Sequence, residues 1–369
     1  MERARMLSRG IFWGFVTGLV GGLIAGCTSK TDLPLNLTAV FVSSRTVVRF
    51  QSPPSDADVS EVASKVALKA EDFERVGDTW AIVDLPKLDA LEADRKTLRE
   101  DVRLSVVEAD RVLGYIPYFL GSGPPENWWK RALRLSGAWS VTKGLPKVTI
   151  EILDADPARF DLVGGVCLLC TVEPVAAGFT LSDYLRSVYR EREAGPRVIL
   201  SGFVPTPKSP AEVALLSVLA SHSLVVLPAG DTFPQGEEIP RREEPPQEIN
   251  NGSVFGEGVL IVGALGITES SPFLLERAVF SNFGADWVSV FSPGSSVTVS
   301  FGQFAGKKAS GTALAAAIAS GVVGLMLSQK PDLSPADLKK ILIKTARATG
   351  SLGSLESGGS IDAHAAVSF

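Results

Sequence analysis

The feature of this 369-residue chain that most constrains its fold is an apolar stretch from Gly311 to Ser328. Written as a helix, the stretch leaves no polar face, and a helix that is hydrophobic all round has to be buried. Its many small residues allow neighbouring strands to approach closely. We therefore predict a helix through the centre of a domain, buried at Ala315, Ala316, Ile318, Ala319, Val322, Val323, Leu325 and Met326.

Strand and helix patterns alternate around this helix, from Trp128 onwards. Such alternation is typical of a doubly wound α/β domain with a parallel sheet. A run rich in Pro and Glu between Asp231 and Gly258 is predicted to be a solvated surface insertion. The predicted strands are 148–153, 166–170, 197–201, 224–228 and 259–262, and the predicted helices are 181–193, 210–221, 311–328 and 335–348.

A smaller unit is predicted ahead of that domain, at 37–113. Its pattern is strand, helix, strand, helix, strand, which outlines a small α/β sandwich. A segment rich in Gly, Pro and aromatic residues, 114–127, is the predicted linker to the domain at 128–369. Within the small unit the predicted strands are 46–50, 80–85 and 102–108, and the predicted helices are 56–68 and 87–96.

The N-terminus has the pattern of an export signal. Three arginines precede an apolar run from Ile11 to Gly26, which is short for a membrane span. The run ends in Leu-Ile-Ala-Gly-Cys, which resembles the bacterial lipobox, so we expect removal of residues 1–26 and acylation of Cys27. An uncleaved anchor helix is the alternative. Either form would hold the folded part outside the cytoplasm, at the cell envelope, on a membrane tether formed by residues 27–36.

The composition argues against nucleic-acid binding and limits the possible catalytic mechanisms. The formal net charge of −5 gives no reason to expect nucleic acid, whose binding depends on clustered Lys and Arg. The chain has two histidines. Because most Ser and Cys nucleophiles depend on a His base, this scarcity limits the catalytic mechanisms open to the chain.

Two cysteines remain besides Cys27, namely Cys167 and Cys170. Outside the cytoplasm they could close a small disulfide. The favoured interpretation is a buried strand at 166–170, in which residues three apart point to opposite faces. No His lies near the pair, which argues against zinc, and we expect neither a metal site nor a cofactor.

Several motifs between Trp128 and Ala366 resemble those of subtilisin-like serine peptidases (subtilases) and occur in that family's order. The stretch Ala-Ser-Gly-Thr-Ala-Leu-Ala at 309–315 resembles the family's Gly-Thr-Ser-Met-Ala turn and helix start. One motif alone would be weak evidence, but the ordered series is strong. It includes Ala-Trp-Ser at 138–140, Pro-Ala-Gly-Asp at 228–231, Val-Gly-Ala at 262–264, Asn-Phe-Gly at 282–284, Ser-Pro-Gly at 292–294, Pro-Asp-Leu-Ser at 331–334 and Gly-Ser-Ile-Asp-Ala at 359–363. The unit at 37–113 is similar to a subtilase propeptide, down to Val-Glu-Ala-Asp at 107–110.

The resemblance implies where a working site would lie. Asp154 follows the predicted strand 148–153 and takes the place of the triad aspartate, at a strand end where open α/β sheets usually place their sites. Ser201 and Gly202 take the place of the turn that binds substrate backbone. Asp231 takes the place of the oxyanion-hole Asn, and Ala313 that of the nucleophilic Ser.

The chain departs from the family at the positions that carry the chemistry. The methyl group of Ala313 cannot attack a carbonyl. An ionised Asp231 offers only acceptors where an oxyanion needs donors, and losing one donor costs about a hundredfold in rate. No His lies between Asp154 and Ser201, so we expect the helix that carries the family's catalytic His to be deleted.

Other residues are poor substitutes for the missing groups. Ser310 lies in the approach to the helix rather than at its start, and His222 and His364 are expected to be structural or solvated. Asp154 and Asp156 form an acidic pair that could hold a cation, although a solvated strand end is the simpler interpretation.

The resemblance therefore implies a secreted, lipid-anchored pseudopeptidase of subtilisin-like fold that acts by binding a peptide or protein. Because it cannot cut itself, the unit at 37–113 should stay covalently attached. The groove beside Ser201 and Gly202 could take an extended peptide by strand addition, or the linker could occupy it. Two alternatives stay open: a serine endopeptidase with rearranged residues, and a surface protein whose propeptide-like unit inhibits other subtilases in trans.

Overall fold

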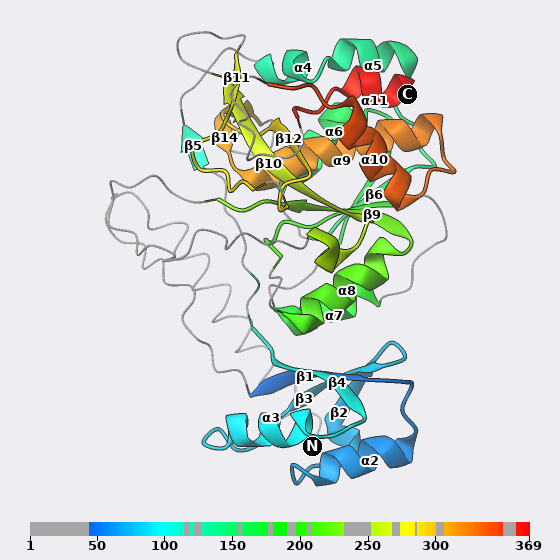
Figure 1. The fold of residues 1–369 in the computed structure, drawn as a ribbon, viewed down its shortest axis with the longest axis vertical. Helices are drawn as coiled ribbons and strands as arrows, with labels where there is room; N and C mark the ends of the chain where they lie inside the picture. Colours follow the sequence, from blue (N-terminus) through cyan, green and yellow to red (C-terminus); the bar gives the residue numbers. More distant parts are fainter. Residues whose placement is uncertain are drawn as a thin grey trace, which may run out of the picture. The chain divides into compact units, whose positions relative to one another are not determined.

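The computed structural model describes a mostly parallel α/β sheet with helices on both faces, preceded along the chain by a small antiparallel sheet (Figure 1). Cys27, Asp154 and Asp156 lie outside the described residues, as do the predicted signal and tether. The described residues are 44–111, 113, 119–121, 127–153, 157–175, 180–189, 197–205, 209–231, 252–267, 274–284, 286–299, 306–349 and 359–369.

The apolar stretch forms helix α9 (Thr312–Gln329), as predicted. Every residue of α9 from Thr312 to Ser328 is buried. The elements that pack against it are β8 (Arg197–Leu200), β9 (Ser223–Pro228), β10 (Val259–Ile267), β12 (Val290–Pro293) and α6 (Pro157–Val166). Among the described helices, α9 is long and apolar enough to cross a membrane, but its burial identifies it as the core helix of this domain.

The central sheet has the strand order β11-β10-β9-β8-β6-β7, and β12 also pairs with β10. Only β11 is antiparallel to its neighbour among these pairings, so the predicted parallel sheet is confirmed. The strands are β6 (Thr149–Ile152), β7 (Thr171–Pro174), β8 (Arg197–Leu200), β9 (Ser223–Pro228), β10 (Val259–Ile267), β11 (Leu275–Arg277) and β12 (Val290–Pro293).

Alternate residues of each central strand point to opposite faces of the sheet. In β9, Leu224 and Val226 join the core around α9, whereas Val225 and Leu227 join the core under α7 and α8. Burial on both faces explains why these strands are continuous apolar runs. One face carries α5 (Leu135–Val141), α6 (Pro157–Val166), α9, α10 (Pro335–Thr345) and α11 (Ala363–Ser368), and the other carries α7 (Leu181–Val188) and α8 (Pro210–Ala220) (Figure 1).

The prediction of a strand at 166–170 is wrong. Helix α6 runs through Val166, and the next four residues form a turn that a Cys167–Cys170 disulfide closes, with the two Cα atoms 5.4 Å apart. Helix α6 connects β6 to β7 and packs on α9, and the expected deletion of the helix that carries the family's catalytic His stays a prediction. The sequence of α6 contains no His.

The small N-terminal sheet is antiparallel, with the order β2-β3-β1-β4. Strand β2 is an addition to the predicted pattern, because its four residues are buried only at the two ends and show no alternation. The elements are β1 (Arg45–Phe50), α2 (Asp56–Ser64), β2 (Phe73–Val76), β3 (Trp80–Asp84), α3 (Leu91–Arg99) and β4 (Leu104–Ala109).

Both faces of this small sheet are covered. Val48, Phe50 and Val83 pack with α2 and α3 in a core of their own. Val47 and Trp80, on the other face, join the core that contains α7 and α8. The small sheet and the large domain therefore share a continuous apolar core.

The packing of α6 on α9 depends on Gly321. A Cβ built there would lie 2.5 Å from the Val166 Cβ and 3.1 Å from the Val163 carbonyl oxygen. Overpacking of a core costs about 1–3 kcal/mol, so Gly321→Ala should lower the free energy of unfolding despite the helix propensity of Ala. As the control, Gly164→Ala in α6 adds a Cβ with nothing within 4 Å and should be neutral or stabilising. Urea denaturation measures both, and equal stabilities would contradict this account.

Candidate functional site

The carboxyl ends of β6, β8 and β9 meet at one edge of the sheet. Leu153 follows β6 and donates its N–H to the Leu200 carbonyl at 2.8 Å. Ser201 follows β8 and donates its N–H to the Val226 carbonyl at 3.1 Å. Asp231 follows β9 by three residues. Ser201, Gly202 and Asp231 thus lie at the edge where open α/β sheets place their sites, and Asp154, next after Leu153, lies outside the described residues.

Helix α9 begins at this same edge. The Gly311 N–H donates to the Gly294 carbonyl at 2.8 Å, and the Gly230 N–H donates to the Thr312 hydroxyl at 3.2 Å. These bonds tie the start of α9 to the turn after β9. Ala313 is the second residue of α9 and is 1 % exposed.

The Asp231 side chain caps the N-terminus of α9. Its Oδ1 accepts a hydrogen bond from the Thr312 N–H at 2.9 Å. The first N–H groups of a helix have no partner within the helix and carry partial positive charge. Gly311, at the N-cap position, has no side chain to serve them. The fold thus brings the predicted residues Ala313 and Asp231 together, with the carboxylate bound to the helix start.

Two side chains fix the turn that carries Asp231, and sequence reasoning did not assign either of them this role. Asn282 Nδ2 and Trp287 Nε1 donate to the Ala229 carbonyl at 3.1 and 2.9 Å. The Asn282 N–H also donates to the Gly230 carbonyl at 2.8 Å. Gly230 has a φ of +102°, and a Cβ there would lie 2.3 Å from Asn282 Nδ2. The turn thus requires glycine at position 230. The Gly of the Ala-Gly-Asp motif is the sequence feature that could have predicted this close packing.

The residues considered as substitutes for the nucleophile and base lie elsewhere. Ser310 belongs to strand β14 (Lys308–Ser310), and its hydroxyl accepts the Ser296 N–H at 2.8 Å. His222 is exposed directly before β9, at the amino end of that strand and so at the opposite edge of the sheet. His364 lies in α11 against Gly137 of α5. The last residue of α5, Val141, accepts a hydrogen bond from Gln329 at the end of α9 remote from Ala313, so His364 lies toward that end. Neither of the chain's two histidines therefore lies near Ala313.

Part of the predicted linker forms a strand. Strand β5 (Phe119–Gly121) pairs antiparallel with β14, with Phe119 opposite Ser310 and Gly121 opposite Lys308 (Figure 1). On its other side β14 pairs with β13 (Val297–Thr298). Since β14 ends two residues before α9 begins, the linker backbone runs beside the approach to Ala313.

Two carboxylates at the end of β4 cap helices of the large domain. Glu108 accepts the Ser209 hydroxyl at 2.7 Å and the Ala211 N–H at 3.3 Å, at the start of α8. Asp110 accepts the Ser182 N–H at 2.9 Å and its hydroxyl at 2.7 Å, at the start of α7. Asp110 is 3 % exposed, so these are buried, charge-assisted hydrogen bonds.

Further polar contacts join the small sheet to α7. Arg186 binds both carboxylate oxygens of Glu74, at 2.8 and 2.6 Å, and these bonds raise the pKa of the guanidinium. Trp80 Nε1 donates to the Tyr189 hydroxyl at 2.9 Å, and burial raises the pKa of that hydroxyl. The contact between the small sheet and α7 therefore includes directional hydrogen bonds as well as apolar packing.

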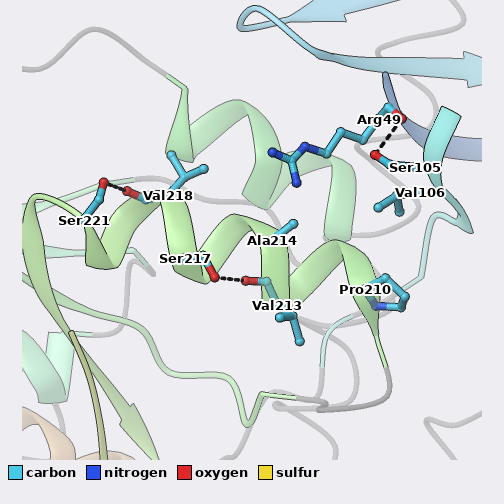
Figure 2. Close-up of a pocket in the computed structure, with 9 residues that line it drawn as sticks. All are labelled: Arg49, Ser105, Val106, Pro210, Val213, Ala214, Ser217, Val218 and Ser221. Atoms are coloured by element: carbon cyan, nitrogen blue, oxygen red, sulfur yellow. Dashed lines mark hydrogen bonds between the residues drawn. The ribbon is translucent and has the colours of Figure 1, made fainter. Parts of the chain in front are cut away.

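An open groove of about 590 Å³ remains between β4 and α8 (Figure 2). Arg49 points across it, while the hydroxyls of Ser105 and Ser217 bind backbone carbonyls at 3.2 and 2.8 Å. The groove lining has no carboxylate and no His, so it offers no acid–base chemistry. The lining residues are Arg49, Ser105, Val106, Pro210, Val213, Ala214, Ser217, Val218 and Ser221.

Comparison with known proteins identifies the family. Residues 160–360 match the sequence profile of the subtilase family, peptidase S8. The match spans more than half of the chain, so the chain belongs to the subtilase family. The comparison with curated proteins found no match.

Solved structures agree with this fold. Fervidolysin from Fervidobacterium pennivorans, described as a keratinolytic enzyme related to subtilisin, superposes with a TM-score of 0.66 at 15 % identity, over 89 % of this chain. The chain spans 61 % of the length of fervidolysin. The A-subunit of the AB5 toxin from E. coli gives a TM-score of 0.52 at 19 % identity, over 66 % of this chain and 99 % of that one. At such identities the likeness concerns the fold, and the predicted subtilisin-like fold is confirmed.

Removal of the Asp231 cap should destabilise the protein. Asp231→Ala deletes the acceptor of the Thr312 N–H, and loss of an N-cap costs about 0.5–2 kcal/mol. Asp231→Asn keeps an acceptor oxygen without the charge and should lose less. Urea denaturation at neutral pH compares both with Asp332→Ala, which changes an exposed carboxylate beyond the other end of α9. If Asp231→Ala were as stable as Asp332→Ala, the capping role would be refuted.

Proposed function

We propose that this member of the subtilase family is a pseudopeptidase, lipid-anchored outside the cytoplasm, which acts by binding a peptide or protein. The start of α9 carries the proposal. There the buried methyl group of Ala313 stands next to Thr312, whose N–H binds the Asp231 carboxylate.

Hydrolysis by a serine peptidase needs an oxygen nucleophile, a base to take its proton and donors for the oxyanion. Ala313 supplies no oxygen, and both histidines lie away from the carboxyl edge of the sheet. The Asp231 carboxylate offers an acceptor where an oxyanion would form. Triad residues act as a unit, so losing nucleophile and base together removes about a million-fold in rate.

The linker supports a binding role over a catalytic one. Its backbone pairs with β14 as β5, which is how an extended peptide adds to a sheet edge. A chain that cannot cut this segment keeps it beside Ala313 permanently. A peptide ligand would have to bind next to β5, along the turn at Ser201 and Gly202, or displace it.

The N-terminal unit supports the same proposal. Glu108 and Asp110 are engaged with α8 and α7 of their own chain, and Glu74 with Arg186. Surfaces that are occupied in cis are not free to inhibit another subtilase in trans. Under this proposal, the N-terminal unit stays attached as a permanent part of the molecule.

Anchoring at Cys27 rests on the sequence, since the segment lies outside the described residues. A basic start, an apolar run and small residues directly ahead of Cys27 support it. The main rival is an active serine endopeptidase with rearranged catalytic residues.

Neither the protein nor its Ala313→Ser variant should react with a fluorophosphonate probe or hydrolyse casein. The variant regains an oxygen but has no base to activate it, and adding Asp231→Asn supplies only an oxyanion donor. An active subtilase assayed in parallel is the positive control. Labelling of any serine, with turnover abolished by Ser310→Ala or His222→Ala, would establish the rival.

The natural mature protein should be one uncleaved chain that begins at an acylated Cys27. Intact-mass and peptide-mapping mass spectrometry should find residues 44–111 and 128–369 in the same polypeptide. A cut between Leu113 and Trp128 that also forms in chain made by purified cell-free translation, where no other protease is present, would contradict the proposal. A mature chain without acyl groups would refute the anchor alone.

A further inference from the structure

Four apolar side chains are exposed around the turn that the Cys167–Cys170 disulfide closes. Leu168 and Leu169, at its tip, are 46 % and 53 % exposed, and Val141 and Leu145 are 41 % and 37 % exposed. The Leu169 N–H donates to the Lys143 carbonyl at 3.0 Å, so segment 141–145 runs beside the turn. We call Val141, Leu145, Leu168 and Leu169 the leucine patch.

The tip of the leucine patch is held in place from below. Cys167 is fully buried, and its sulfur is covalently bound to that of Cys170. A Cβ on Gly144 would lie 2.6 Å from the Cys167 sulfur, and one on Gly324 of α9 would lie 3.2 Å from it. With its flanking cysteines packed between these two glycines, the Leu168–Leu169 pair cannot fold back into the core. Exposed apolar patches of this kind mark interaction sites.

The segments that build the patch contain Lys and Arg but no Asp or Glu, although Arg134 pairs with Asp362 and the exposed carboxylates Glu173 and Asp332 follow close by in the sequence. Residues 127–150 contain five Lys and Arg and no Asp or Glu, and residues 162–172 contain no charged residue. Lys143 and Lys147 are exposed next to Leu145, and Lys330 is exposed at the end of α9. Gln329, beside Lys330, donates to the Val141 carbonyl at 3.5 Å, which places that lysine near the patch. In a chain of net charge −5, the three exposed lysines outnumber the two exposed carboxylates in or next to these segments.

We propose that the leucine patch contacts an anionic phospholipid bilayer, with Leu168 and Leu169 in the interfacial region and the lysines at the headgroups. Apolar side chains bind such an interface by burial, and lysines bind by attraction to anionic lipid. The inference builds on the proposed membrane attachment, because a tether at Cys27 would hold the molecule near a bilayer and the patch would orient it there. The patch itself binds without the tether.

The test is co-sedimentation with vesicles of a chain that has no acyl anchor, residues 27–369 with Cys27→Ala. This chain keeps the compact unit formed by residues 42–234 and 246–369. Vesicles of phosphatidylcholine with phosphatidylglycerol are compared with phosphatidylcholine alone. Binding to the anionic vesicles should be about tenfold stronger and should weaken with salt. The double substitution Leu168→Ser and Leu169→Ser should weaken it by about tenfold or more.

Two matched variants complete the test. Leu88→Ser with Val102→Ser changes side chains of the N-terminal unit that are 73 % and 82 % exposed, and should leave binding unchanged. Lys143→Ser with Lys147→Ser should weaken binding to anionic vesicles and flatten its salt dependence. Circular dichroism verifies that each variant is folded. Undiminished binding by the Leu168 and Leu169 variant, equal binding to neutral vesicles, or no binding at all would overturn the inference. Absence of acyl groups at Cys27 in the natural protein would refute the anchor and leave this inference standing.

Discussion

Burial of α9 is the constraint on which the rest of the structure depends. A helix without a polar face needs apolar neighbours on all sides, and the central strands and α6 supply them. The neighbours approach closely only where side chains are small, as at Gly321 against Val166. Burial also leaves the first N–H groups of α9 without water. The Asp231 carboxylate, which follows β9, accepts a hydrogen bond from one of these groups, the Thr312 N–H. The burial that builds the core therefore also favours the contact between Asp231 and Thr312.

Stability and hydrolysis make opposite demands on this helix start. Its partial positive charge can stabilise a resident carboxylate or a transient oxyanion, and in this chain Asp231 already uses it. Ala313 likewise suits the resting fold. Alanine is the best helix former and its methyl group needs no hydrogen-bond partner in a fully packed position, whereas a buried serine hydroxyl would need one. Each residue thus favours the folded state at a position where catalysis would need a different group, which supports the proposed pseudopeptidase.

The sequence predicted the elements whose burial pattern is unambiguous. Strand β9, buried on both faces, was predicted at 224–228 and runs from Ser223 to Pro228, and α9 was predicted within one residue. The strand predicted at 166–170 is in fact a helix end and a turn. A short apolar run fits either structure, and the disulfide that closes the turn depends on the tertiary fold, which the local sequence does not reveal. Strand β5 escaped prediction because its partner β14 is remote in sequence. Motif order predicted that Ala313 and Asp231 belong to one site, and the structure brings them together. The hydrogen bond from Thr312 to Asp231 was not predicted, because it depends on side-chain placement that no motif records.

Three helices of this domain, α7, α8 and α9, have their N-termini bound by carboxylates from elsewhere in the chain. Asp110 and Glu108 serve α7 and α8, and Asp231 serves α9. In a parallel α/β domain the helix that follows a strand starts near the carboxyl edge of the sheet, so the positive ends of the helices gather there. In this chain the positive charge at these helix starts is balanced by three of the chain's own carboxylates. Two of them, Glu108 and Asp110, lie at the end of β4 in the small N-terminal sheet. Removal of that sheet would uncover the starts of α7 and α8 together with the apolar face that Val47 and Trp80 cover. The N-terminal unit is therefore part of the electrostatic and apolar balance of the folded protein, which gives a physical reason for it to be retained.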